Sequence, residues 1–102
     1  MSNNAQLDKE EEILRLISDQ CARRIINTIQ EESKSALQIS KELGTELSTI
    51  YRRLNKFQKY GLLKTTFQIT PDGKKSYYYQ CKINAINASY RQGKFQVSLA
   101  FN

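Results

Sequence analysis

The sequence predicts one α+β domain in which four helices are followed by two β-hairpins. Apolar residues recur at helical spacing as far as residue 60 and alternate after Gly61, which marks the change from helices to strands. Residues 70–73 (TPDG) and 91–94 (RQGK) each interrupt an alternating stretch and indicate a turn. Of the 102 residues, 39% are hydrophobic and 25% are charged, so a single modest core is expected.

The first two helices are predicted over about residues 8–18 and 19–31, after a polar segment, residues 1–7, that we expect to be frayed. Asp8 and Glu11 have capping-box spacing, and the acids at positions 10–12 suit the positive end of a helix dipole. Ser18 and Asp19 signal the second N-cap. The apolar residues that follow at helical spacing are Cys21, Ala22, Ile25, Ile26 and Ile29.

A third, short helix is predicted to start at a capping box formed by Ser35 and Gln38 and to end at Gly44 as a left-handed C-cap. Either Ala36 or Leu37 turns inward with Ile39 and Leu43. The fourth helix, residues 47–59, follows after two residues, Thr45 and Glu46. Either of these two is expected to be its N-cap, and Ser48 is placed to share that role. A short helix, a glycine-containing turn and a longer basic helix are the helix-turn-helix arrangement.

Residues 47–59 (LSTIYRRLNKFQK) have two chemically different faces when read at 100° per residue. One face is an apolar stripe. The other is cationic and hydrogen-bonding, and it suits contact with a polyanion, although a solvated charged face would have the same pattern. The stripe is Leu47, Ile50, Leu54 and Phe57; the opposite face is Ser48, Arg52, Asn55, Lys56 and Lys59, flanked by Tyr51 and Arg53.

Two hairpins are predicted after the helices, at residues 62–81 and 83–101. Thr65, Phe67 and Ile69 alternate with polar residues, and a β-favouring strand returns through Ser76 to Cys81. The first hairpin carries Lys74 and Lys75 at its tip and is therefore expected to be the wing of the helix-turn-helix. The second, with alternating apolar residues on both strands, is expected to pack on the wing sheet or to pair across a dimer axis.

The charge is unevenly distributed along the chain. Residues 1–50 carry 6 Lys/Arg and 9 Asp/Glu, a net charge of −3, whereas residues 51–102 carry 10 Lys/Arg and Asp72 alone, a net charge of +9. A concentrated positive half attracts phosphate backbones or anionic lipid. No apolar run approaches the length of a membrane span and no signal-peptide pattern is present, so we expect an intracellular protein. Cys21 and Cys81 are then expected to be free, buried thiols rather than a disulfide.

The stretch RRIINTIQEESKSALQISKELGTELSTIYRRLNKFQKYGLLKTTFQITPDGKKSYYY resembles the ArsR-type winged helix-turn-helix regulators, and the match covers about residues 12–80. Its most specific pieces are ISKELGTELSTIYRRLNKFQKYGLLK and the wing that ends in tyrosines. The MarR and TrmB groups contain similar stretches. The resemblance implies a cytoplasmic transcriptional regulator, associated with the nucleoid when bound to DNA, that recognises double-stranded DNA as a homodimer.

Three departures from the family pattern limit what the resemblance implies. Glu46 and Leu47 stand where the family usually has small or polar residues, at the start of the reading helix. The third helix lacks the cysteine pair of the metal-sensing members and the chain has no histidine, so no metal and no cofactor are expected. The C-terminal hairpin replaces the closing helix common in the family, which leaves the mode of dimerisation open.

The predicted DNA contacts lie on the fourth helix and on the wing tip. The resemblance places base reading at Leu47, Ser48, Tyr51 and Arg52. Arg52 offers paired donors suited to guanine or to a phosphate, and lysines suit backbone phosphates. Tyr51 either contacts a base or shields the core, and the wing lysines either reach the DNA or are simply solvated. The predicted set is Ser48, Tyr51, Arg52, Arg53, Asn55, Lys56, Lys59, Lys74 and Lys75.

Two other functions are compatible with the sequence. In the first, a winged-helix module docks an acidic protein partner on its basic face, as the apolar and acidic start of the fourth helix, Glu46 and Leu47, suggests. In the second, tyrosines 77–79 stack on single-stranded RNA, although one face of that strand is expected in the core. No enzyme activity is predicted, because the sequence has neither a nucleophile–base pair nor a glycine-rich phosphate loop.

Overall fold

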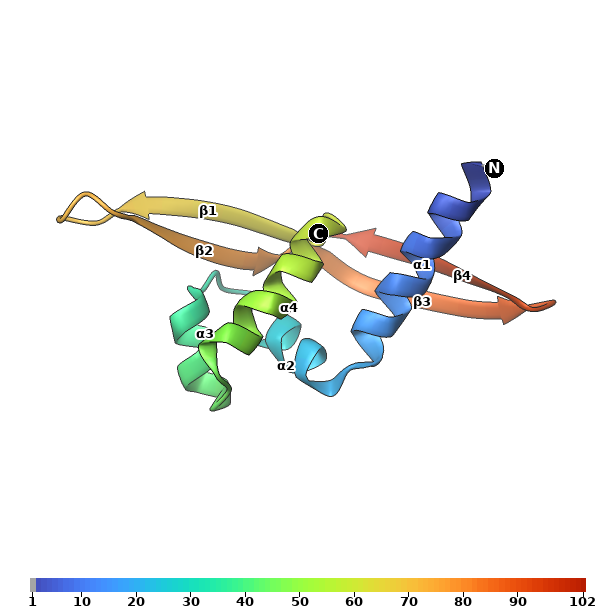
Figure 1. Cartoon of the computed structure of the whole chain (residues 1–102), viewed down its shortest axis with the longest axis horizontal. Helices are drawn as coiled ribbons and strands as arrows, with labels where there is room; N and C mark the ends of the chain where they lie inside the picture. The colour runs from blue at the N-terminus through green and yellow to red at the C-terminus, as the bar shows by residue number, and fades with distance from the viewer. Residues whose placement is uncertain (1) are drawn as a thin grey trace.

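Over residues 2–102, which the computed structural model describes with side chains from Lys9 onward, four helices precede two antiparallel hairpins. This confirms the α+β class and the predicted order of elements. The hairpins extend from opposite sides of the helices, giving dimensions of 55 × 27 × 24 Å (Figure 1). The elements are α1 (Ser2–Ser18), α2 (Gln20–Thr28), α3 (Ala36–Leu43), α4 (Leu47–Lys59), β1 (Leu63–Ile69), β2 (Lys75–Cys81), β3 (Ile83–Arg91) and β4 (Lys94–Phe101).

Helix α1 begins well before the predicted boundary. The prediction of a frayed segment at residues 1–7 is wrong for residues 2–7, which are helical, while Met1 lies outside the described residues. Asp8 is therefore inside the helix and is not its N-cap. The segment is polar but contains no glycine or proline, and Ala5, Gln6 and Leu7 are good helix formers, so polarity alone does not end the helix.

Helix α2 starts where predicted and ends three residues early. The carboxylate of Asp19 accepts a hydrogen bond from the backbone N–H of Ala22 at 2.9 Å, which confirms the N-cap. After Thr28 the chain leaves the helix, and the Ile29 carbonyl accepts a hydrogen bond from the Cys81 N–H instead. The prediction of a helix to residue 31 failed because this bond comes from a strand far along the chain.

The turn between α3 and α4 follows the prediction, apart from its second cap. Ser35 and Gln38 form the capping box, and Gly44 ends α3 with φ +62°. Ala36 is the inward residue, whereas Leu37 is 51% exposed. Glu46 occupies the N-cap of α4 but makes no side-chain hydrogen bond there, so side-chain capping of α4 was wrongly predicted.

The core lies where α2, α3 and α4 meet the base of β1 and β2. Its fully buried large side chains come from all of these helices and from the residue before β1. Cys81 is buried and Cys21 is half-buried, and both thiols are free as predicted. The fully buried set is Ile25, Ile29, Ile39, Ile50, Leu54, Phe57 and Leu62.

The β1–β2 hairpin is held to the helices by an isolated β-bridge between Lys34 and Tyr79. Lys34 and Tyr79 exchange two backbone hydrogen bonds of 3.0 and 2.8 Å, so the segment between α2 and α3 pairs with β2. At the other end of the hairpin the Gly73 N–H donates to the Thr70 carbonyl at 2.9 Å, which is the predicted β-turn. The helices and the hairpin are therefore joined by main-chain bonds as well as by the core.

The β3–β4 hairpin forms a sheet of its own and packs against α1 (Figure 1). The expected packing on the wing sheet is therefore not observed. Gln92 and Gly93 connect the strands with φ +54° and +78°, the positive values that a type I′ turn requires. That turn matches the right-handed twist of the strands, so it favours their pairing as a hairpin.

A polar cluster ties α2 to α3 beside the Lys34 bridge. The Glu42 carboxylate accepts hydrogen bonds from the Thr28 hydroxyl at 2.6 Å and from the Lys34 ammonium at 2.9 Å. The hydrogen bond from Thr28 contributes most to lowering the pKa of Glu42, and the hydrogen bond from Lys34 lowers it further. A carboxyl with a lowered folded-state pKa stabilises the fold above its unfolded pKa, and this contribution is lost as pH falls through the folded value.

Replacing Glu42 by glutamine is therefore expected to flatten the pH dependence of unfolding. The difference in unfolding free energy between wild type and E42Q should be present at neutral pH and should shrink as pH falls below about 4.5. Urea unfolding at several pH values measures it. Glu32→Gln, which changes an exposed carboxylate outside this cluster, serves as control, and equal pH dependence of the two variants would contradict the assignment.

Candidate nucleic-acid interface

Helix α4 presents its cationic face to solvent because its other face is completely buried from Ile50 onward. Ile50, Leu54 and Phe57 have no exposed surface. At the C-terminal end, the N–H groups of Gly61 and Leu62 donate back to Gln58 and Phe57, which is a Schellman motif with Gly61 at φ +73°. The helix is thus fixed in rotation and in length. The residues of the opposite face, all exposed, are Ser48, Arg52, Asn55, Lys56 and Lys59.

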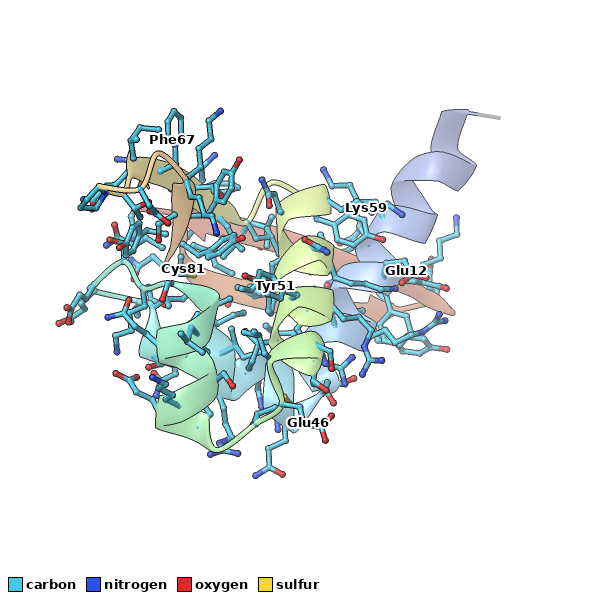
Figure 2. All side chains as sticks on the ribbon, turned by 60° about the vertical axis from the view of Figure 1, so that its left-hand side comes forward. Glu12, Glu46, Tyr51, Lys59, Phe67 and Cys81 are labelled. Atoms are coloured by element: carbon cyan, nitrogen blue, oxygen red, sulfur yellow. The ribbon has the colours of Figure 1, made fainter. Side chains whose placement is uncertain are left out.

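The start of α4 departs from the predicted stripe. Leu47 was assigned to the buried face, but it is 37% exposed, because it lies at the first residue of the helix, beside the solvent-exposed turn. Glu46, also exposed, lies at this end of the helix, and Lys59 lies toward the other (Figure 2). The ammonium of Lys59 is 5.6 Å from the centroid of the Tyr60 ring. Cationic side chains therefore belong to the middle and the C-terminal half of α4.

Arg53 has a structural partner. Its Nε lies 3.1 Å from the carboxylate of Asp19, the same group that caps α2, and the Arg53 side chain is 28% exposed. The contact is an ion pair without the alignment of a hydrogen bond. Arg53 thus braces α4 against the start of α2, and it lines a shallow hollow together with the exposed Lys56, one turn further along α4.

Tyr51 lies on the side of α4 that faces the first hairpin (Figure 2). Burial, and then the neighbouring hydroxyls of Tyr51 and Tyr77, raise the pKa of Tyr79. Tyr79 is buried, whereas Tyr51 and Tyr77 remain 45% and 47% exposed. As predicted, Tyr77 and Tyr79 lie on the same face of β2. On this face only Tyr79 belongs to the core.

The tip of the β1–β2 hairpin carries exposed Lys74 and Lys75 on an ordered turn. The carbonyl of Lys74 accepts hydrogen bonds from both the N–H and the hydroxyl of Thr70, and that hydroxyl also contacts Asp72. The Lys75 ammonium lies 4.7 Å from the centroid of the Phe67 ring. The backbone from which both lysines project is therefore held by several bonds.

An exposed apolar strip on the β1–β2 hairpin was not identified from the sequence. Phe67 and Ile69 are 52% and 61% exposed, and the Phe67 ring lies 6.2 Å from that of Tyr77 on the paired strand. The alternation of residues 65–69 shows that these side chains share a face, but it gives no signal that the face is left uncovered. Because the hairpin projects past α3, its distal half has nothing to pack against (Figure 1).

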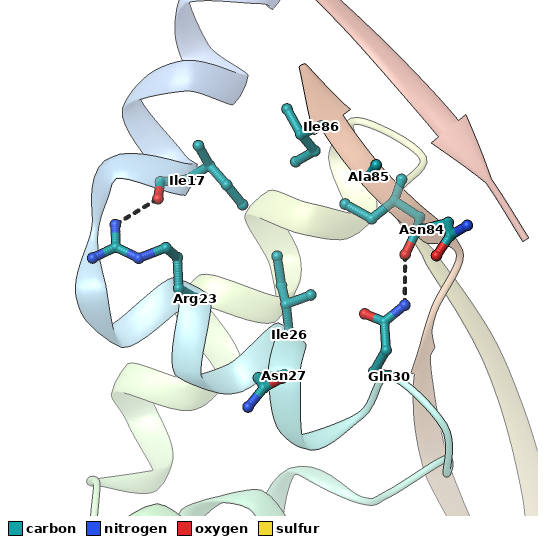
Figure 3. A pocket seen from close by; sticks show the side chains of 9 residues that line it. Ile17, Arg23, Ile26, Asn27, Gln30, Asn84, Ala85 and Ile86 are labelled. Atoms are coloured by element: carbon teal, nitrogen blue, oxygen red, sulfur yellow. Dashed lines mark hydrogen bonds between the residues drawn. The ribbon is translucent and has the colours of Figure 1, made fainter. Parts of the chain in front are cut away.

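A concavity lies between α1, α2 and β3, and Figure 3 shows it from close by. It measures about 290 Å³ and has an apolar floor that includes Ile26 and Ile86. Arg23 donates to the Ile17 carbonyl and Gln30 donates to the Ile83 carbonyl, each at 2.8 Å. These polar side chains therefore join α1 and α2 to each other and to β3. We interpret the concavity as part of the packing between these elements.

No protein-family model and no curated protein sequence matches the chain. Within residues 2–102, none of the helices has the length and apolar character needed to cross a membrane. The geometry of α4 and of the β1–β2 hairpin is therefore the basis for assigning a function.

Proposed function

We propose that this protein is a DNA-binding transcriptional regulator of the winged helix-turn-helix type, related to the ArsR group. In this proposal α4 enters the major groove of duplex DNA, and the β1–β2 wing lies beside it. One observation carries the proposal: the buried stripe of α4 leaves Arg52, Lys56 and Lys59 exposed, without an ion pair among the described side chains, next to a hairpin with two lysines at its tip.

The dimensions and the chemistry of α4 support this role. A helix with its side chains is about 10–12 Å wide, and the major groove is about 12 Å wide. Residues 47–59 contain no acidic residue that would repel phosphates. The short helix α3, the Gly44 turn and α4 have the order expected for a helix-turn-helix, in which the second helix reads base edges.

The proposed contacts divide into base reading and phosphate binding. Arg52 is assigned to a guanine, because its guanidinium can donate two parallel hydrogen bonds to O6 and N7. Ser48 and Asn55 are assigned to base edges or phosphates nearby. The lysines set the position of the protein on the duplex, since phosphate contacts carry no sequence information. The phosphate-binding set is Lys56, Lys59, Lys74 and Lys75.

The experiment is selection of bound duplexes from a random pool, followed by affinity measurements on the selected site. Arg52→Ala is expected to weaken binding by about 1–3 kcal/mol and to relax the preference at one base position. Arg52→Lys keeps the charge but loses the paired donors, so it should lose that preference while keeping most non-specific affinity. Lys82→Ala, which removes a charge outside α4 and the wing tip, is the control.

A competing function is docking of an acidic protein partner on the same basic face. The exposure of Leu37 and Leu47, which are 51% and 37% accessible, favours docking of a protein partner. Apolar side chains at the start of α3 and α4 have no role in binding phosphates, whereas they suit a protein interface. Absence of duplex affinity, or unchanged duplex affinity of R52A/K56A, would favour this function. Tighter binding to single strands than to duplex would instead favour nucleic-acid stacking on the exposed wing aromatics.

A further inference from the structure

The outer edge of β1 carries main-chain groups that no other described segment of the chain pairs with. On the neighbouring strand, Tyr79 uses its N–H and its carbonyl for Lys34 and not for β1. Hydrogen-bonded and non-hydrogen-bonded pairs alternate along an antiparallel ladder. Every second pair from Tyr79 outward therefore directs its main-chain groups away from the partner strand. On β1 these outward-facing residues are Thr65, Phe67 and Ile69.

The turn at the tip gives the same result independently. Thr70 donates its N–H to the carbonyl of Lys74 at 2.8 Å, so these two residues are a hydrogen-bonded pair. The next pair, Ile69 and Lys75, is therefore non-hydrogen-bonded, and its main-chain groups face outward. Unpaired N–H and carbonyl groups along a strand edge are a template for pairing with another chain.

The edge of β1 is open over a longer stretch than the edge of β2. The segment before α3 occupies the inner half of the β2 edge, where the Ile29 carbonyl accepts from Cys81 and Lys34 pairs with Tyr79. That segment then turns into α3 at Ala36. β1 lies on the side of the hairpin away from α3, and the sheet has no described strand beyond it (Figure 1). An added strand therefore has more room along β1.

One face of this open edge is apolar. Phe67 and Ile69 are 52% and 61% exposed, and the Phe67 ring lies 6.2 Å from the ring of Tyr77 on the paired strand. A strand added along β1 would place every second side chain on this face, against Phe67 and Ile69. The apolar strip that the helices leave uncovered thus lies directly beside unpaired main-chain groups.

The charges of the hairpin determine the chemistry of the added strand. Lys64 is exposed on the other face of β1, and Lys74 and Lys75 are exposed at the tip. None of these lysines forms an ion pair with a described side chain. The only acid in the hairpin, Asp72, already contacts the Thr70 hydroxyl. A second copy of β1 would bring lysines against lysines, whereas an acidic strand would be attracted.

We propose that β1 binds an extended acidic segment of a partner protein as a third, antiparallel strand of the hairpin. The bound segment alternates apolar and acidic residues. Its apolar side chains pack on Phe67 and Ile69, and its carboxylates lie on the face of Lys64. Because β1 has 7 residues, a segment of about seven residues spans it. This interface lies outside the face of α4 assigned to DNA, and it does not depend on that function.

The test uses the full chain, without DNA, and a fluorescein-labelled heptapeptide of alternating glutamate and valine. Fluorescence anisotropy is expected to show saturable binding with a Kd below about 1 mM. A heptapeptide of alternating lysine and valine is the charge-reversed control and should bind at least about 10-fold more weakly. N-methylation of the valine amides, which face β1 in this arrangement, should abolish binding. A glutamate–valine peptide that does not bind, or that binds no better than either control, would overturn the proposal.

Two variants at one position separate main-chain pairing from apolar contact. Ile69→Ala removes apolar surface, whereas Ile69→Pro also removes the outward N–H and leaves the bonds between β1 and β2 in place. I69P should bind the peptide about 5-fold more weakly than I69A, the effect of one hydrogen bond. Phe67→Ala should weaken binding about 10-fold, as expected for an anchoring aromatic. Equal affinities of I69P and I69A would argue against main-chain pairing and so against an added strand.

Amide hydrogen exchange locates the added strand without any substitution. In the free wild-type chain the N–H groups of Phe67 and Ile69 should exchange quickly, and the glutamate–valine peptide should slow both. Those of Lys75 and Tyr77, on the open part of the β2 edge, should not change, and slowing there instead would overturn the choice of edge. Slowing at β1 that grows with protein concentration in the absence of peptide would show a second copy as the occupant and would also overturn the proposal. Because DNA is absent throughout, none of these outcomes bears on the proposed function.

Discussion

Phe57→Ala is expected to lower the free energy of unfolding by about 3–5 kcal/mol. Phe57 is fully buried, and its ring lies in the core cluster with residues from α2, α3 and the strands. Removing the ring forfeits its transfer free energy and leaves a cavity that rigid neighbours fill only partly. A domain of this size has about 5–15 kcal/mol of stability in total, so the variant should be close to unfolding.

Urea unfolding followed by circular dichroism measures this loss. The matched control is Gln58→Ala, the next residue on α4, whose side chain is exposed and whose replacement should change stability by less than about 0.5 kcal/mol. Both variants are measured at the same protein concentration, because any self-association would make stability concentration-dependent. A loss below about 1 kcal/mol for F57A would mean that Phe57 is not central to the core, and the rotation assigned to α4 would then be wrong.

The affinity for duplex DNA is expected to fall steeply with salt. If Arg52, Lys56, Lys59, Lys74 and Lys75 each neutralise one phosphate, the logarithmic slope is about −4.5 per protomer, which corresponds to about a 500-fold loss between roughly 50 and 200 mM salt. The reason is the release of counterions condensed on the phosphates. Fluorescence anisotropy of a labelled duplex at several salt concentrations gives the slope.

Single substitutions separate the contacts that make up this slope. Lys56→Ala and Lys75→Ala should each reduce it by about 1, whereas Lys82→Ala should leave it unchanged. Arg53→Ala should also leave it unchanged, because Arg53 is paired with Asp19. A slope near zero for wild type would contradict phosphate binding by α4 and the wing. A slope that falls with K56A but not with K75A would remove the wing from the interface.

Much of the fold was predictable because its signals are local. The capping box of Ser35 and Gln38, the left-handed Gly44 and the two hairpin turns depend on residues within a few positions of one another. The helical stripe of α4 was also readable, since its period directly reflects which side is buried. The same local reasoning misplaced the start of α1, because a polar composition does not by itself prevent a helix.

The candidate site was predictable only for side chains whose exposure is determined by their position on their own helix. Arg52, Lys56 and Lys59 are exposed because they lie opposite a buried stripe, and position within the helix is sufficient to show that. Arg53 differs, because its partner Asp19 lies in the cap of another helix. The exposure of Phe67 was likewise hidden, since alternation marks which residues share a face but not whether anything covers it.

The sequence by itself determined the order of helices and hairpins, the turns that join them and the face of α4 that is cationic, because backbone propensity, capping and periodicity act between near neighbours. Only the tertiary structure decided that α2 stops at Thr28, that Arg53 pairs with Asp19, and that both hairpins carry uncovered apolar surface. These features depend on contacts between segments far apart in the chain, whose distances no local pattern encodes.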